Sequence, residues 1–215
     1  MRVELVASMG DDLTVVNAAR VSFGVRHDSL TDRDRGLIAR LLRDGHSSPF
    51  RGVCATFRIE CSIGCARQIA RHAEYLRWNE RSTRYSEFPD DFVYPSLKRQ
   101  VGKAMDYEYG PLDGDAVESA GAVLHEAYTH AHAAYRKLLT LGVCREDARY
   151  VLPLGLETAL VVTGDLKGWF RFLSQRLHPS AQDEIREIAQ EIDAAISAIA
   201  PASWAAWVSY GRKAL

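Results

Sequence analysis

Five arginines lie close together between Ala66 and Ser86, and they are the side chains of this chain best suited to hold an anion. Arginine recognises phosphate through a planar fork of N–H donors that stays charged at neutral pH. The five are Arg67, Arg71, Arg77, Arg81 and Arg84, with only Glu74 and Glu80 among them. Such a cluster repels itself unless an anion or solvent separates the charges. It is interpreted either as a site for a phosphate-bearing ligand or as a solvated basic face, and the spacing alone does not choose between them.

The composition is that of an ordinary globular protein and shows no general excess of basic residues. The chain has 215 residues, of which 47% are hydrophobic and 26% charged, and its formal net charge is −1. This length suits one domain with a substantial core, so we expect a single domain over residues 1–215. We do not expect nucleic-acid binding, because it requires a broad excess of Lys and Arg. The arginine cluster is therefore expected to be a local site.

The sequence indicates neither a targeting segment nor cysteine chemistry. Met1–Ala7 alternates charged and apolar residues, and no window holds about 18 uninterrupted apolar residues, so we expect a cytoplasmic protein without a membrane partner. His125, His130 and His132 are not four residues apart, and no metal site is predicted. The cysteines lack CxxC spacing and are predicted to be buried, reduced thiols rather than nucleophiles; they are Cys54, Cys61, Cys65 and Cys144.

Strands and helices on both sides of the cluster must position its arginines. Period-two alternation predicts strands at Arg2–Ala7 and Val53–Ile63, and a strand-like segment at Leu156–Thr163. The cluster itself is expected to form about two turns of helix and a loop. The region from Tyr85 to Gly114 is interpreted as a lid or a long connection. Apolar spacing and caps predict helices at Asp12–Arg20, Thr31–Gly45, Ala116–Leu141, Arg145–Pro153 and Leu166–Arg176, one from Ser180 to Pro201 with Asp183 in a capping box, and Ser203–Lys213.

Six fragments of the chain, in order, resemble motifs of the flavin-dependent thymidylate synthase family, which methylates deoxyuridylate without a cysteine nucleophile. They are Ala18–Phe23, Gly45–Phe50, Ala66–His72, Asn79–Ser86, Ala148–Pro153, and Arg176 with Ala181–Ile185. The resemblance covers nearly the whole chain. It implies an α+β fold of one domain, with a mostly antiparallel curved sheet flanked by long helices. It also implies FAD, with methylenetetrahydrofolate and NADPH as co-substrates, and active sites shared between subunits of a homotetramer.

The same resemblance implies roles for individual residues. Gln68, Arg71, Arg149 and Arg176 match positions that hold the pyrimidine nucleotide. Glu80, Ser82, Thr83 and Arg84 match a loop that cradles its base and phosphate from another subunit. Ser22, His46, Ser48 and His72 match positions near the flavin, and Arg71 is expected to contact it as well. Arg176 and Ser82 are the expected catalytic residues, since an arginine beside the pyrimidine can stabilise charge that develops on a carbonyl during reduction.

The chain also departs from the family's pattern. Ala73 stands where the family has the second arginine of Arg-His-Arg, and eight residues instead of seven separate it from Ser82. One extra residue rotates a helix by about 100°, so a bulge or loop is expected near Glu74–Arg77. Arg51 replaces a glutamate, Asp165–Lys167 replaces Asn-x-Arg, and Arg171 replaces Asn or His. We therefore expect cofactor contacts from Arg77, Asp165, Lys167 and Arg171, with Arg51, Arg77 and Arg171 as candidates for the FAD phosphates.

These departures leave the substrate open. The first hypothesis is conversion of dUMP to dTMP. The alternatives are a UMP/dUMP C5-methylase like those of nucleoside-antibiotic biosynthesis, which accept the ribonucleotide, and a hydroxymethylase. From another class, a non-catalytic nucleotide- or nucleic-acid-binding relative would have kept the arginines and lost the flavin. Retention of Gln68, Arg71, Ser82, Arg149 and Arg176 together argues against that decay.

Overall fold

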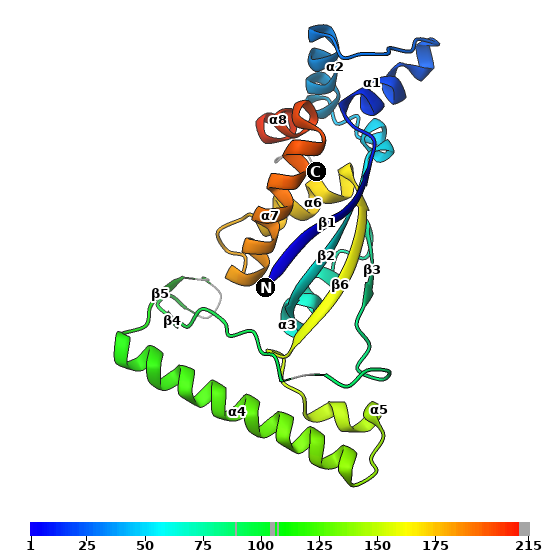
Figure 1. Cartoon of the computed structure of the whole chain (residues 1–215). Coiled ribbons are helices and arrows are strands. Elements are labelled where there is room, and N and C mark those ends of the chain that lie inside the picture. The colour runs from blue at the N-terminus through cyan, green and yellow to red at the C-terminus, as the bar shows by residue number, and fades with distance from the viewer. Residues whose placement is uncertain (89, 104–105, 107, 211–215) are drawn as a thin grey trace. The chain divides into compact units, whose positions relative to one another are not determined.

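The computed structural model describes residues 1–88, 90–103, 106 and 108–210 and forms two compact units (Figure 1). The larger unit comprises Arg2–Ile59, Ile69–Asn79 and Leu160–Leu215, and the smaller comprises Glu60–Gln68 and Glu80–Ala159 together with Met1. The chain has the predicted α+β fold with an antiparallel sheet. Among the described residues, every helix is too short or too polar to cross a bilayer.

The main sheet has the strand order β1-β2-β6-β3. Its strands are β1 (Arg2–Met9), β2 (Cys54–Ser62), β6 (Glu157–Asp165) and β3 (Leu76–Glu80). In the larger unit, β6 runs antiparallel to β2, because Leu166 N–H donates to the Val53 carbonyl and the Thr56 and Thr163 hydroxyls are 2.9 Å apart. The alternation that predicted β2 is confirmed, since Ala55, Phe57 and Ile59 are buried.

The helices of the larger unit surround an aromatic core. The Trp169 indole N–H donates to the Ala55 carbonyl (3.1 Å), the Phe57 ring meets Trp169 edge-on, and Phe170 stacks on Trp207 at 4.9 Å. Helix α2 packs on α8, and α6 on α7. The helical elements are α1 (Asp12–Arg20), η1 (Val21–Phe23), α2 (Asp32–Arg43), η2 (Ser48–Gly52), α6 (Leu166–Arg176), α7 (Asp183–Ile199) and α8 (Pro201–Tyr210).

The structure differs from the prediction at two places, and a third part of the prediction is not tested. Helix α7 begins at Asp183 and not at Ser180, because the Ser180 hydroxyl bonds the His178 ring (2.7 Å) instead of capping a helix. The arginine-rich stretch holds a strand, β3, that was missed, since its five residues are too few and too polar for a clear alternation. The predicted end of the last helix, residues 211–213, lies outside the described residues.

The smaller unit is built around one long helix, α4 (Gly114–Thr140), as predicted to within two residues. Only His132 and Tyr135 of α4 are buried, and the His132 ring bonds the Phe88 carbonyl at 3.1 Å. Where the sequence suggested a lid or a connection, β4 (Lys98–Gln100) and β5 (Tyr109–Pro111) pair antiparallel. The remaining elements are α3 (Ile63–Ala70), which continues into the larger unit, α5 (Arg145–Ala148) and η3 (Arg149–Val151).

Candidate active site

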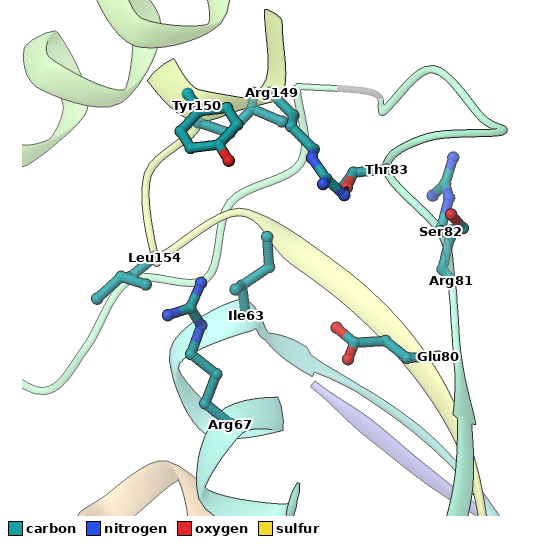
Figure 2. A pocket seen from close by; sticks show the side chains of 10 residues that line it. Ile63, Arg67, Glu80, Arg81, Ser82, Thr83, Arg149, Tyr150 and Leu154 are labelled. Atoms are coloured by element: carbon teal, nitrogen blue, oxygen red, sulfur yellow. Dashed lines mark hydrogen bonds between the residues drawn. The ribbon is translucent and has the colours of Figure 1, made fainter. Parts of the chain in front are cut away.

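The smaller unit contains a pocket of about 620 Å³ that gathers charged side chains from α3, β3, the loop after β3, and η3 (Figure 2). Three arginines and one carboxylate lie beside three hydroxyl side chains and several apolar ones. The lining residues are Ile63, Arg67, Glu80, Arg81, Ser82, Thr83, Arg149, Tyr150, Leu152 and Leu154. An excess of arginine over carboxylate makes this pocket attractive to an anion.

Backbone hydrogen bonds hold the walls of the pocket together. Ile63 N–H donates to the Leu156 carbonyl and Gly64 N–H to the Leu154 carbonyl, both at 2.9 Å, so the first turn of α3 is tied to the segment before β6. Arg81 N–H donates to the Ala159 carbonyl at 2.9 Å and fixes the end of β3. Arg67 lies one helical turn after Ile63, which directs its side chain to the same space.

Arg149 joins η3 to the loop after β3. Its Nη1 donates to the Thr83 hydroxyl at 3.1 Å, and its Nε donates to the Glu146 carbonyl at 3.0 Å. The two residues are 66 positions apart in sequence, and Figure 2 shows their side chains meeting at one edge of the pocket. The sequence assigned Arg149 and Thr83 to halves from different subunits, whereas here one chain brings them together.

Glu80 is the acidic residue of the pocket. Partial desolvation raises the pKa of its carboxyl group, while the Thr158 hydroxyl, which donates to it at 3.3 Å, and the nearby charge of Arg67 oppose that shift. Arg67 makes no hydrogen bond or ion pair within the described part of the chain. Arg67 is therefore available to an anionic ligand, and Glu80 offers an acceptor for an N–H group.

Two arginines of the stretch, Arg81 and Arg84, make contacts outside the pocket, although Arg81 also lines it. The Arg84 guanidinium pairs with Glu146 at 2.8 Å, so this expected substrate residue does not line the pocket. Arg81 donates to the Glu87 carbonyl at 3.0 Å and lies over the Phe88 ring. The loop after β3 is thus stabilised by its own arginines, and its Ser82 and Thr83 hydroxyls remain at the pocket.

A second cluster lies in the larger unit and combines two expected site residues. Arg176 Nε donates to His72 Nε2 at 2.9 Å. His72 is buried, and burial together with the Arg176 charge lowers its pKa to about 4. His72 is therefore neutral at physiological pH. Arg71, beside it in sequence, is exposed and makes no hydrogen bond or ion pair within the described part of the chain.

The remaining expected cofactor residues are scattered over the larger unit. Ser22, His46 and Ser48 are exposed, and among the described residues no hydrogen bond joins them to one another or to His72. Asp165 caps α6 by accepting from Gly168 N–H at 2.7 Å, and Lys167 is half-buried. Gln68, by contrast, belongs to the smaller unit and is half-buried on α3.

Arg77 and Arg171 contact the turn that follows α3. Arg77 Nη1 donates to the carbonyls of Ala73 and Leu76. Arg171 pairs with Glu74 at 3.3 Å. A turn at residues 71–75 overlaps the first part of the bulge or loop expected near Glu74–Arg77, whereas Leu76 and Arg77 already belong to β3.

Sequence reasoning left three polar side chains of the pocket out of its candidates: Arg67, Arg81 and Tyr150. Arg67 was noted as part of the cluster but not chosen, although its place one turn after Ile63 on a helix was a usable signal. Tyr150 also lines the pocket, and only its position next to Arg149 could have indicated it. No local sequence pattern shows that Arg67 and Tyr150 line the same pocket, because the pocket forms from segments that are distant in sequence.

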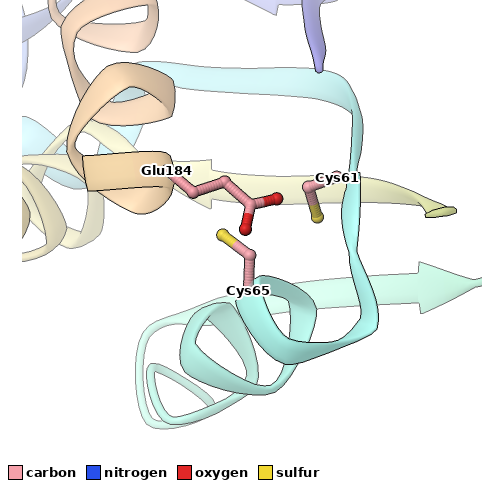
Figure 3. A group of neighbouring side chains, drawn as sticks. All are labelled: Cys61, Cys65 and Glu184. Carbon is pink, nitrogen blue, oxygen red and sulfur yellow. The ribbon is translucent and has the colours of Figure 1, made fainter. Parts of the chain in front are cut away.

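The cysteines are free thiols, as predicted, but they are not all buried. Cys61 on β2 and Cys65 on α3 are buried (Figure 3), Cys54 is half-buried and Cys144 is exposed. Cys144 is exposed because it lies at the start of α5, where its thiol contacts Asp147 at 3.3 Å. None of the four lines the pocket.

The chain combines an α+β fold, an arginine-rich pocket in the smaller unit and a neutral, buried histidine in the larger unit, and comparison with known proteins identifies its family. Residues 4–202 match the family described as "Thymidylate synthase complementing protein". The chain belongs to this family, and it is an enzyme.

Relatives and solved structures agree with this assignment. The chain is 40% identical to a flavin-dependent thymidylate synthase of Thermus thermophilus, covering 95% of this chain and 74% of that one. It is 34% identical to the enzyme of the same name from Pseudothermotoga lettingae, covering 97% and 90%. The crystal structure of the UMP/dUMP methylase PolB from Streptomyces cacaoi bound with 5-Br UMP superposes with a TM-score of 0.90 at 35% identity, covering 98% and 95%.

Proposed function

We propose that this enzyme methylates C5 of a pyrimidine nucleoside monophosphate and converts dUMP to dTMP. Methylenetetrahydrofolate would donate the carbon, reduced FAD the hydride, and NADPH would reduce the flavin. The observation that carries the proposal is the pocket in which Arg67 and Arg149 lie with Glu80, Ser82 and Thr83. The names of the relatives, flavin-dependent thymidylate synthase and UMP/dUMP methylase, support the substrate class.

The pocket matches the chemistry of a pyrimidine monophosphate. Arg149 and Arg67 neutralise the phosphate dianion, and the hydroxyls of Ser82 and Thr83 complete its hydrogen bonds. The Glu80 carboxylate accepts from the N–H of a uracil ring. Arg176, held by His72, stabilises negative charge on a pyrimidine carbonyl as C6 is reduced. Gln68, Arg71 and Arg84 stay in the proposal as further nucleotide contacts, with Arg84 first having to leave Glu146.

The exposed side chains expected at the flavin suit FAD, whereas Arg77, Asp165 and Arg171 already have partners within the chain. Arg71 is exposed without a partner among the described residues, and Ser22, His46 and Ser48 are exposed donors, a set that suits a pyrophosphate and ribityl hydroxyls. The Asp165 carboxylate already caps α6 and would repel a phosphate, so its chemistry permits only contact with an N–H or O–H of the cofactor. When bound, FAD supplies the hydride, and the protein residues bind, orient and exclude water.

The direct test is to purify the protein and measure flavin absorbance near 450 nm, as flavin cofactors show. The yellow protein is then given methylenetetrahydrofolate and NADPH with either dUMP or UMP, and the nucleotide product is identified by mass spectrometry. We expect a C5-methylated product with dUMP. A higher kcat/KM with UMP than with dUMP would favour the UMP/dUMP methylase alternative. A hydroxymethylated product would favour the hydroxymethylase alternative. Nucleotide binding without flavin and without product would contradict the proposal.

Replacing all four cysteines is expected to leave methylation intact, because none of them lines the pocket. Ala is suited to the buried Cys61 and Cys65, and Ser to Cys54 and Cys144. The measurement is kcat with dUMP beside flavin absorbance and melting temperature. A folded, flavin-loaded variant that has lost turnover would instead indicate a covalent cysteine mechanism.

A further inference from the structure

The turn between α3 and β3 places a tyrosine against the histidine that holds Arg176. Tyr75 N–H and Leu76 N–H both donate to the His72 carbonyl, at 3.1 and 2.9 Å, which closes a tight turn. This turn brings Tyr75 Oη to 2.5 Å from His72 Nδ1.

The direction of each hydrogen bond follows from the chemistry of its partners. A guanidinium only donates, so His72 Nε2, which bonds Arg176 Nε at 2.9 Å, must be unprotonated. A neutral imidazole then carries its proton on Nδ1 and donates it to Tyr75 Oη. The burial that lowers the pKa of His72 agrees with a neutral ring.

Side chains of α6 hold Tyr75 in this position. The Arg171 guanidinium lies 5.1 Å from the centre of the Tyr75 ring and pairs with Glu74 at 3.3 Å. A Cβ at Gly168 would lie 2.8 Å from the Tyr75 carbonyl oxygen, so the turn packs against α6 where only glycine fits. The Phe172 ring meets the His72 ring edge-on at 5.0 Å, which fixes the histidine from its other side.

We propose that Tyr75 is a positioning residue for the reaction. By accepting from His72 Nδ1–H, it holds the tautomer whose Nε2 can orient Arg176. Without the phenol oxygen, His72 can move its proton to Nε2, where it would face the Arg176 N–H and break the contact. The inference rests on the proposed function only in giving Arg176 a role at the substrate; the tautomer itself is independent of that role.

The first experiment determines the tautomer in the full-length protein. Nitrogen-15 labelling of the seven histidines allows each ring to be followed by NMR, and the His72 signals are assigned by their loss in His72→Ala. The proton is expected on Nδ1 in the wild type and redistributed toward Nε2 in Tyr75→Phe. A wild-type His72 protonated on Nε2 would overturn the proposal, whether or not the protein methylates a nucleotide, and even if Tyr75→Phe fails to fold.

The second experiment measures turnover in a double-mutant cycle. Tyr75→Phe keeps the ring beneath Arg171 and is expected to lower kcat/KM for the nucleotide about tenfold, because Arg176 is no longer held in place. In a His72→Ala background it should have no further effect, because Tyr75 acts only through His72. The matched control is Tyr109→Phe on β5, whose hydroxyl makes no hydrogen bond within the described part of the chain. An equal loss with and without His72 would refute the positioning role.

If the wild type methylates neither nucleotide, nucleotide affinity is measured for the same four proteins of the double-mutant cycle instead of turnover. Tyr75→Phe is then expected to weaken nucleotide binding in the His72 background and to be silent in His72→Ala. In that case the proposed reaction fails while the tautomer result still decides this inference. Unchanged affinity together with an unchanged tautomer would refute it.

Discussion

Arg149→Ala is expected to weaken binding of the pyrimidine nucleotide by about 2 kcal/mol or more, which is roughly a 30-fold rise in Kd. Arg149 is half-buried, and its guanidinium is oriented by Thr83 at 3.1 Å and the Glu146 carbonyl at 3.0 Å. A preoriented, charged donor loses little entropy when it binds phosphate, so its removal leaves phosphate oxygens without a charged partner. The same loss is expected for Arg176→Ala. Isothermal titration with dUMP measures both.

Two further variants separate charge from local structure. Thr83→Val keeps the Arg149 charge and removes the hydroxyl that both orients Arg149 and is proposed to contact the phosphate, so a smaller loss of about 1 kcal/mol is expected. Arg136→Ala removes an exposed arginine of α4 that does not line the pocket, and it should bind dUMP like the wild type. Nucleotide affinity unchanged in both Arg149→Ala and Arg176→Ala would contradict the assignment of this site.

The elements that the sequence predicted best are those with strong local signals. The capping boxes at Asp11 and Thr31 start α1 and α2, and Asp165 starts α6 where it was predicted. The elements it missed depend on partners elsewhere in the chain. Strand β3 is held at its end by the bond from Arg81 N–H to Ala159, and nothing in its own five residues indicates that pairing.

The residues of the site were predicted mainly from motifs, whereas the geometry of the site could not be predicted from the sequence. Glu80, Ser82, Thr83 and Arg149 do line one pocket, but the bond between Arg149 and Thr83 spans 66 positions and has no local signature. Arg84 shows the converse limit. It lies in a motif that matches the family, yet its guanidinium forms an ion pair with Glu146 on α5.

The exposed aromatic residues of the chain are consistent with association between copies. Phe23, Tyr85 and Tyr150 are each about 80% exposed, at 81%, 79% and 83%. Val21 and Leu141 are exposed to a similar degree. We propose, as the resemblance to the family implies, a homotetramer with dihedral symmetry in which each active site takes residues from more than one chain.

Mixing two inactive variants, Arg71→Ala and Ser82→Ala, is therefore expected to restore part of the activity. Arg71 belongs to the larger unit and Ser82 to the smaller, and each has its own local contacts; Ser82, for example, accepts from Arg84 N–H at 3.2 Å. Each variant should thus damage one half of a site and leave the other half intact. If the halves come from different chains and subunits exchange randomly, about one quarter of the sites in an equal mixture receive both intact halves.

A matched mixture makes the assembly test quantitative. When the double variant Arg71→Ala/Ser82→Ala is mixed equally with wild type, sites shared between chains should keep about one quarter of the activity, whereas sites built within one chain should keep about one half. Exchange is verified by native mass spectrometry of the mixture, and each variant must first be shown to fold. In both mixtures half of the Arg71 positions and half of the Ser82 positions are intact. If sites are shared between chains, the two mixtures must therefore show the same activity. No recovery in the first mixture despite exchange, or a monomer by light scattering, would refute the arrangement.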